Sequence, residues 1–487
     1  MTAEYGRRRS LRRRVLTLAL VLLVSCAAVR ADAQDGEQPL YLTLRSIIFG
    51  SQIDGRRALS QLRLRGGTDA VPGLVLARRY SKLQHEIDTT LAALTGNRFA
   101  NDWSEWMVWL QNHSEVTPHH SYLRLKLDVL NRMDRSFNRF LRIGGAHEIR
   151  LEEVVWRGVR VDGIPALTDP VQMPAFMADF MTPDEPVFGV EIDGDARAYP
   201  LRIVDWHEVL NDVVGGVPVT LAYGPLSGAG ILFDRRVEGR DERFEFGTSG
   251  LLYRSNELMY DVQTDSLWSQ FTGRPVVGPL TGSGIRLDIL PIVLTSWADW
   301  RDRHPDTKVL SPDTGHTRAY LPHIAYGGYA SSQELIFPSA TVDTRLPAKA
   351  PVFGVRVAAG VKAWPLAAFA GGRLLNDSVG YLNVVVIGDA DTQTARVYRR
   401  DGHTFAATRF AEVLREGDDD WTVTEAALVG PRGVELPRVA GHVAYWFAWT
   451  GFGGADTELY VEPPPQRAVP ADVTAPADEP VIPPTDG

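Results

Sequence analysis

The sequence predicts an α+β protein in which an α-helical region precedes a larger β-rich region with an internal repeat. Between residues 39 and 147, apolar residues recur at helical spacing, as Trp103, Trp106 and Leu110 do. From residue 149 to 460 the apolar residues alternate with period two, and glycine, proline and aspartate turns interrupt them. A stretch of this second region returns further along the chain, which indicates duplication.

Residues 1–33 have the features of an export signal. An arginine-rich head precedes the apolar run VLTLALVLLV, which is too short for the roughly 20 residues of a membrane-spanning helix. Ala31-Asp32-Ala33 is a cleavage site of the A-x-A type. Leu23-Val24-Ser25-Cys26 resembles a bacterial lipoprotein box, which would place a lipid on Cys26. Both routes predict an exported protein, periplasmic or lipid-anchored in the bacterial cell envelope, that meets the membrane only through its signal or its lipid.

Charge and cysteine content narrow the functional classes. The chain has 51 basic and 60 acidic residues, and without residues 1–33 it has 44 and 58, a net charge of −14. Such an acidic exported protein has no electrostatic basis for binding nucleic acid. Cys26 is the only cysteine. The mature fold therefore has no disulfide, thiolate metal site or cysteine nucleophile.

The helical region, residues 39–147, is expected to be a packing domain. Several short helices in succession are typical of a HEAT-like arrangement. One amphipathic segment ends at Gly96, a typical helix stop. The aromatic stripe that includes Trp103 and Trp106 is expected to be core, since such residues are usually buried. At the other end of the chain, residues 461–487 contain eight prolines and are predicted to be a disordered tail.

The repeat is visible in long matched segments. PVFGVEIDGDARAYPL (186–201) returns as PVFGVRVAAGVKAWPL (351–366), 165 residues further on, and Leu-Asn-Asp at 210–212 returns at 375–377 with the same offset. These matches predict repeats over about 186–310 and 351–460. We expect a hairpin at Asp193-Gly194 and a bulge or close packing at the strand glycines Gly189 and Gly354. The shared Asn-Asp pairs are expected to cap a short helix.

Candidate functional residues are those that only one repeat contains. Asp205, Trp206, His207 and Glu208, expected on a helix, correspond to Ala-Gly-Gly-Arg at 370–373. A lone histidine on an apolar helix face is often an ordinary core residue, and a functional His207 is the alternative.

The first repeat is also longer around residues 248–270, where polar groups alternate with aromatic side chains. Such a mixture suits a small neutral or carbohydrate-like ligand, because rings supply apolar contact and polar groups fix orientation. The alternative is a loop whose polar side chains cap its own backbone. With Trp206, the candidate ligand-binding residues are Ser249, Tyr253, Asn256, Asp261, Trp268 and Gln270.

Several long motifs in order resemble one bacterial family. They include WRGVRVDGIPAL (156–167), ARAYPLRIVDWHEVLNDVVGG (196–216), GILFDRR (230–236), SGLLYRSNELMYDVQTDSLWSQ (249–270) and a WADWRDRHPDTKVL helix (297–310). The family is catalogued as domain of unknown function 3179, and the resemblance covers about residues 150–460. It implies no reaction.

The family resemblance bears on one short turn. Its members typically carry Cys-Pro-Leu-Cys-Gly where this chain has Gly224-Pro225-Leu226-Ser227-Gly228. In such members the cysteine pair would bind copper or another soft metal, or cycle as a disulfide, with His207 and Met259 as further ligands. Here both sulfur positions are empty, so no cofactor is assigned.

We therefore expect an exported protein that binds an unknown small molecule and has a degenerate thiol or metal site in its first repeat. One alternative is a cysteine-independent, hydrolase-like enzyme with Ser227 as nucleophile, His207 as base and Asp205 or Glu208 as orienting acid. Another is a metal-binding protein that uses His207, Met259 and Asp261. Ser227 lies in no Gly-x-Ser-x-Gly elbow, and His207-Glu208 belongs to no His-Glu-x-x-His motif. Whether the protein is an enzyme, and its oligomeric state, stay open.

Overall fold

The computed structural model describes residues 39–462, except 100–101, 238, 341–342 and 454–455. The expected export signal with Cys26, and the proline-rich tail from residue 463, lie outside the described residues. Among the residues that are described, no helix is long and apolar enough to span a bilayer.

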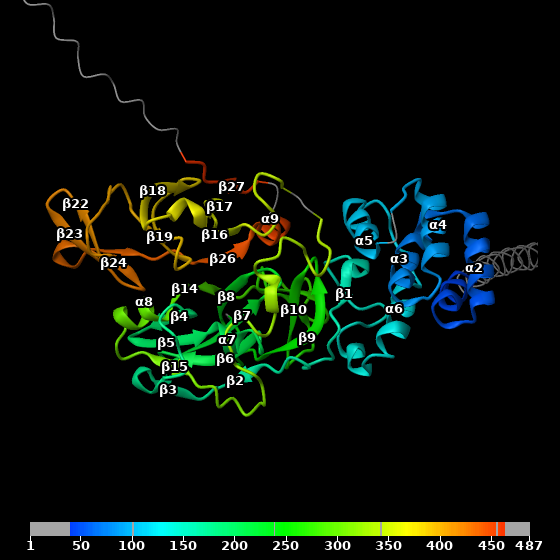
Figure 1. Ribbon diagram of the computed structural model, residues 1–487, viewed down its shortest axis with the longest axis horizontal. Coiled ribbons are helices and arrows are strands. Elements are labelled where there is room, and N and C mark those ends of the chain that lie inside the picture. The colour runs from blue at the N-terminus through cyan, green and yellow to red at the C-terminus, as the bar shows by residue number, and fades with distance from the viewer. Residues whose placement is uncertain (1–38, 100–101, 238, 341–342, 454–455, 463–487) are drawn as a thin grey trace, which may run out of the picture.

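Helices come first, at one end of the molecule (Figure 1). Residues 39–49 are helical, and they are followed by α2 (Gln52–Arg65), α3 (Val71–Tyr80), α4 (Gln84–Thr95), α5 (Trp103–Asn112) and α6 (Tyr122–Leu130). As predicted, α4 ends at Gly96, whose φ of 77° is left-handed. Trp106 and Leu110 of α5 are fully buried, which confirms that the aromatic stripe is core. The HEAT-like comparison stays a prediction.

The β-rich region consists of two units. The first unit, residues 154–310, contains three sheets. One has the strand order β1 (Val154–Trp156), β9 (Phe246–Tyr253), β10 (Asn256–Asp261), β11 (Leu267–Ser269) and β12 (Arg274–Val277). The next has β13 (Ile289–Leu290), β8 (Ala229–Asp234), β7 (Val217–Gly224), β6 (Val209–Val214) and β2 (Leu167–Thr168). The third has β14 (Val293–Ser296), β4 (Pro186–Ile192), β5 (Asp195–Pro200), β15 (Lys308–Leu310) and β3 (Gln172–Pro174).

The second unit (residues 351–459) also contains three sheets. One has the strand order β26 (Gly441–Tyr445), β16 (Pro351–Val357), β17 (Gly360–Pro365) and β27 (Glu458–Leu459). The next has β18 (Arg373–Val379), β19 (Leu382–Asp389) and β20 (Thr394–Arg399). The third has β21 (Ala406–Ala407), β22 (Val413–Glu416), β23 (Asp419–Val423), β24 (Ala427–Val429) and β25 (Glu435–Pro437). The chain is thus an α+β protein whose longer helices lie mainly in its N-terminal part.

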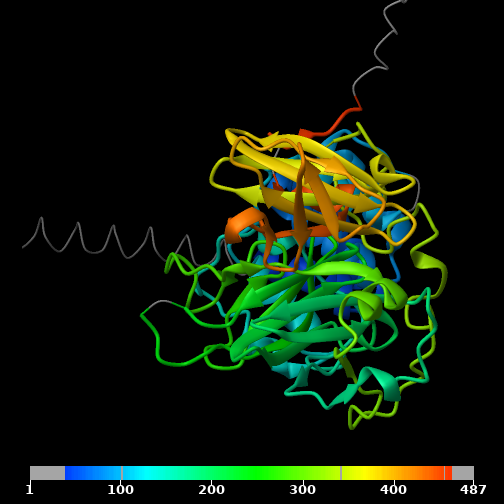
Figure 2. The same ribbon diagram turned by 90° about the vertical axis from the view of Figure 1, so that its left-hand side faces the viewer.

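The two units lie against each other, the second (yellow to orange) over the first (green) in Figure 2. One apolar core joins them, because Ala222, Met259 and Trp268 pack in the same cluster as Val352 and Trp446. The units are therefore held together by buried apolar surface.

The same contacts recur in both units. Strands β4 and β5 pair Val187 with Pro200, and β16 and β17 pair Val352 with Pro365, each 165 residues later. The Asn211 side chain bonds both backbone groups of Phe246, and Asn376 does the same with Phe405. The hairpin predicted at Asp193-Gly194 is confirmed, and both of its residues have positive φ. A common origin of the units stays a prediction.

Tryptophans pack directly on the two strand glycines. A β-carbon on Gly189 would lie less than 3.0 Å from the ring of Trp300 in α8 (Trp297–Arg303). A β-carbon on Gly354 would meet Trp449 of α9 (Trp446–Gly453) equally closely. The close packing predicted at both glycines is confirmed, and it places each helix against its sheet.

Three local predictions were wrong. Residues 205–208 do not form a helix, because α7 (Leu201–Val204) ends before them and they lie in a turn that leads into β6. Asn211-Asp212 and Asn376-Asp377 lie within strands, where both asparagine side chains bridge to a neighbouring segment instead of capping a helix. The helix expected over 297–310 ends at Arg303, and Lys308–Leu310 form strand β15.

We expect Gly354→Ala to destabilise the protein by about 1–3 kcal/mol, the usual effect of overpacking a rigid core. Urea unfolding followed by tryptophan fluorescence measures this loss. Gly451→Ala is the matched control, because a β-carbon at Gly451 meets nothing within 4 Å and alanine is the better helix former. Equal unfolding midpoints for the two variants would contradict the packing argument.

Candidate functional site

The turn that joins β7 to β8 holds Gly224 and Ser227, the two positions at which the family resemblance predicts cysteines. The Ser227 hydroxyl is fully buried and donates to the Gly224 carbonyl oxygen at 3.0 Å. A β-carbon on Gly224 would lie 2.7 Å from Ser227 Oγ and 2.6 Å from Gln270 Oε1. Side chains at 224 and 227 therefore share one small space, and the Gln270 amide borders it. Gln270 donates to Ala222 and Ala229, while its Oε1 has no partner among the described groups.

The second unit covers this turn. The Tyr445 backbone N–H donates to the Ser227 carbonyl oxygen at 2.8 Å. Its ring lies against Gly228, where a β-carbon would come within 3.1 Å of three ring atoms. Gly228 also has a φ of +61°, which glycine adopts without strain. The turn is thus enclosed between the units.

His207 is buried and has a partner at each ring nitrogen. Nδ1 lies 2.7 Å from the Pro165 carbonyl oxygen, which can only accept, so Nδ1 carries the proton. Nε2 then accepts from the Tyr320 hydroxyl at 2.6 Å. Burial lowers the pKa of His207 to about 4, so the ring is neutral at physiological pH. The structure forms no hydrogen bond between His207 and Ser227, and a catalytic role for either stays a prediction.

Glu208 belongs to a buried ion cluster that the sequence did not indicate. Arg157 binds Glu208 through both terminal nitrogens, at 2.5 and 2.8 Å, and binds Glu257 at 2.7 Å. The Tyr326 hydroxyl also donates to Glu208. The Arg157, Glu208 and Glu257 side chains are at most 6% exposed. Arg157 stands in the WRGVRVDG motif, and that motif is the one sequence signal that could have pointed to it.

Two carboxyl groups have a raised pKa, Glu257 within this cluster and Asp205 close to Glu208. Burial raises the pKa of Glu257 to about 8, although the charge of Arg157 acts to lower it. Burial, and then the Glu208 carboxylate, raise the pKa of Asp205 to about 7. Oε1 of Glu257 has no hydrogen-bond partner within the described residues. Shifted carboxyl groups of this kind are frequent at functional sites and also occur in structural ion networks.

The residues predicted to bind a ligand in 248–270 lie mostly in strands and bond within their own sheet. Ser249 donates to the Leu258 carbonyl oxygen, and Asp261 accepts from Thr264 and Trp268. Tyr253 is partly buried, and Asn256 is buried with both amide atoms unpartnered in the described structure. Trp206 is partly buried beneath Arg318. Gln270 is the candidate whose side-chain amide borders the Ser227 turn, beside Gly224.

The residues present do not fit a soft metal. Gly224 and Ser227 supply no sulfur, His207 uses both nitrogens, and Asp261 is bonded to its own turn. Met259 packs in the core shared by the units. Among the residues that the structure describes, no three histidine, cysteine or acidic side chains form a metal-binding group.

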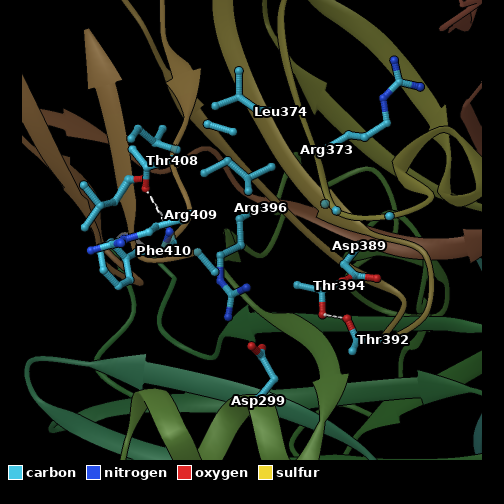
Figure 3. A pocket seen from close by; sticks show the side chains of 18 of the residues that line it. Asp299, Arg373, Leu374, Asp389, Thr392, Thr394, Arg396, Thr408, Arg409 and Phe410 are labelled. Carbon is cyan, nitrogen blue, oxygen red and sulfur yellow. Dashed lines mark hydrogen bonds between the residues drawn. The ribbon is translucent and has the colours of Figure 1, made fainter.

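A cavity of about 340 Å³ opens in the second unit (Figure 3). Its wall includes residues 371–374 and 387–389 together with Thr392, Thr394 and Arg396. Asp299 and Arg303 of α8 complete it from the first unit. By the offset of 165, residues 371–373 correspond to 206–208, and residues 389 and 392 correspond to Gly224 and Ser227. The cavity therefore lies at the same edge of the second unit as the enclosed turn of the first.

Two glycines leave this edge open. Gly371 and Gly372 have φ values of 74° and 70°, and a β-carbon on either would meet at most Asp389 Oδ2, at 3.9 Å. In the first unit, Trp206 and His207 occupy these positions. The candidate residues predicted from the sequence all lie in the first repeat, where side chains stand at the positions of this glycine pair. The signal that this prediction missed was the adjacent glycine pair, which supplies space.

The fold and site define a class: a β-rich protein of two similar units, one edge closed and the other hollowed. A family model described as protein of unknown function (DUF3179) matches residues 161–456. The chain belongs to this family. No curated protein and no solved structure matches the chain.

We expect the stability of the protein to depend on pH through Glu257. Its folded pKa lies above the ordinary carboxyl value, so the unfolded chain releases this proton first, and the contribution to stability falls as the pH rises from about 5 to 8. The Glu257→Gln variant has no proton to release at this position, so it should not lose this stability. The difference in free energy of unfolding between the variant and the wild type should therefore rise in favour of the variant by about 1 kcal/mol or more between about pH 5 and pH 8. Chemical denaturation at both pH values measures it.

Glu242→Gln, a change at an exposed glutamate, serves as the control and should run parallel to wild type. Parallel curves for Glu257→Gln as well would show that the native state does not retain the Glu257 proton.

Proposed function

We propose that this protein is an exported small-ligand-binding protein of the cell envelope, either periplasmic or lipid-anchored. Its fold would hold two copies of one β-rich module. In the first unit the family's thiol site is degenerate, and in the second unit the corresponding edge binds the ligand. The contrast between the two edges carries the proposal.

Two features of the first edge support the loss of thiol chemistry. The space between positions 224 and 227 is occupied by the Ser227 hydroxyl and bordered by Gln270, and Tyr445 covers it. The charges behind it largely satisfy one another, because Arg157 binds both Glu208 and Glu257. A closed site of this kind stabilises the fold and leaves no sulfur to react.

The second edge supports ligand binding through its volume and lining. About 340 Å³ lies within the range of small-molecule sites, roughly 300–1,000 Å³. Leu374, Ile387 and Val413 supply apolar surface, while Asp389 and Arg409 supply polar groups. This combination is typical of sites that bind and orient a small molecule.

Restoring both sulfurs should restore soft-metal binding. In the processed protein, the double variant Gly224→Cys, Ser227→Cys places both thiols in one space, and we expect it to bind about one Cu(I) per chain when reduced. Gly224→Ala with Ser227→Ala introduces the same steric change without sulfur and should bind none. Metal content after dialysis measures this difference. Stoichiometric Cu(I) in the wild type would contradict a degenerate site.

Filling the second edge should abolish binding of the natural ligand. Ala406 and Ala407 are neighbours in β21, both exposed, and only Ala407 lines the cavity. Native mass spectrometry of protein purified from its own cell envelope should show a small-molecule adduct in wild type and in Ala406→Trp. Ala407→Trp should lack it. An adduct of equal abundance in both variants, or in neither, would contradict binding at this edge.

A further inference from the structure

The charges that line the second-unit cavity specify what it can bind. Four arginines and two aspartates reach its wall: Arg303, Arg373, Arg396, Arg409, Asp299 and Asp389. A ligand meets only those charges that the protein has not already neutralised. The existing ion pairs therefore decide the chemistry of the ligand.

Three of the arginines are paired. Arg303 lies 3.1 Å from Asp299, and Arg373 lies 2.8 Å from Glu462. Arg396 is buried and donates to Glu425 at 2.9 Å. Figure 3 shows the Arg396 guanidinium directed toward Asp299. The ion pair with Arg303 also neutralises the Asp299 carboxylate.

Arg409 and Asp389 are the two charged residues of the cavity wall whose charges are not paired within the described ranges. Within the described ranges, neither forms an ion pair: Arg409 lies over the ring of Phe410, and Asp389 accepts only the backbone N–H of Asp391. Asp389 ends β19, whereas Arg409 lies in the loop between β21 and β22. Figure 3 shows the two on opposite sides of Arg396. The cavity thus presents one cation and one anion at separate places.

Apolar side chains line the space around these charges. Leu374, Ile387 and Val413 are partly buried in its wall, and Phe410 is 48% exposed. Because Gly372 has no side chain, a ligand atom can approach Oδ2 of Asp389 from that side. An ammonium group suits Asp389, a carboxylate suits Arg409, and an apolar body suits the surface between them.

We propose that the second-unit cavity binds a small zwitterion with an apolar body and well-separated charges, the chemistry of an apolar dipeptide. Its carboxylate pairs with Arg409 and its ammonium with Asp389. This assignment rests on the proposed ligand-binding function and names the ligand class for the same site.

Isothermal titration calorimetry of the full chain with the dipeptide Leu-Leu tests the assignment. Arg409→Gln and Asp389→Asn should each weaken binding about two- to fivefold, the range of a solvent-accessible ion pair. Arg415→Gln and Asp391→Asn are matched controls, because both residues are exposed and neither lines the cavity. These controls should bind Leu-Leu as wild type does.

Blocked dipeptides assign each charge to its partner. Leu-Leu-amide lacks the carboxylate, so Arg409→Gln should no longer change its affinity while Asp389→Asn still does. N-acetyl-Leu-Leu lacks the ammonium and should show the reverse. Equal binding of the free and blocked forms would overturn the zwitterion and leave ligand binding intact. Absence of Leu-Leu binding, when the wild type still carries its natural adduct, would also overturn it; absence of both would overturn the proposed function.

Discussion

The packing of Trp300 on Gly189 is the contact on which the arrangement of the candidate sites depends. The glycine leaves room for the indole ring on the face of β4, and the ring holds α8 against the first-unit sheet. Asp299 and Arg303 on this helix then reach the cavity of the second unit. Trp449 on Gly354 repeats the contact and fixes α9, whose Trp446 lies in the core shared by the units. A small change of volume at either glycine would therefore be felt well beyond its own strand.

The two units use the same edge in opposite ways. In the first unit, the segment after α7 carries large side chains, and His207 is locked between Pro165 and Tyr320. In the second unit, Gly371 and Gly372 leave the corresponding space empty, and α8 closes one side of it. Side-chain volume at two adjacent positions thus decides whether the edge is core or cavity. The corresponding positions of the two units thus differ in both directions, because side chains are smaller at some positions and larger at others.

Electrostatics separates the edges further. The first edge buries Arg157 with two glutamates, and burial raises the pKa of one of them, Glu257. The second edge pairs most of its arginines internally, and leaves Arg409 and Asp389 to solvent or ligand. The first cluster stabilises the interior, whereas the second pair of charges is available for recognition.

Local pattern was enough to predict the α+β class, the helix stop at Gly96, the hairpin at Asp193-Gly194 and the repeated strands, because these depend on neighbours within a few residues. Pattern also located the turn at 224–228, and the family resemblance predicted cysteines at positions 224 and 227. Local pattern could not predict the cluster around Arg157, because its partners lie 51, 100 and 169 residues away in the sequence. Nor could it show that the Gly371-Gly372 pair opens a cavity against α8. Those features depend on which distant segments pack together, and that is decided by the burial of apolar surface across the whole chain rather than by local periodicity.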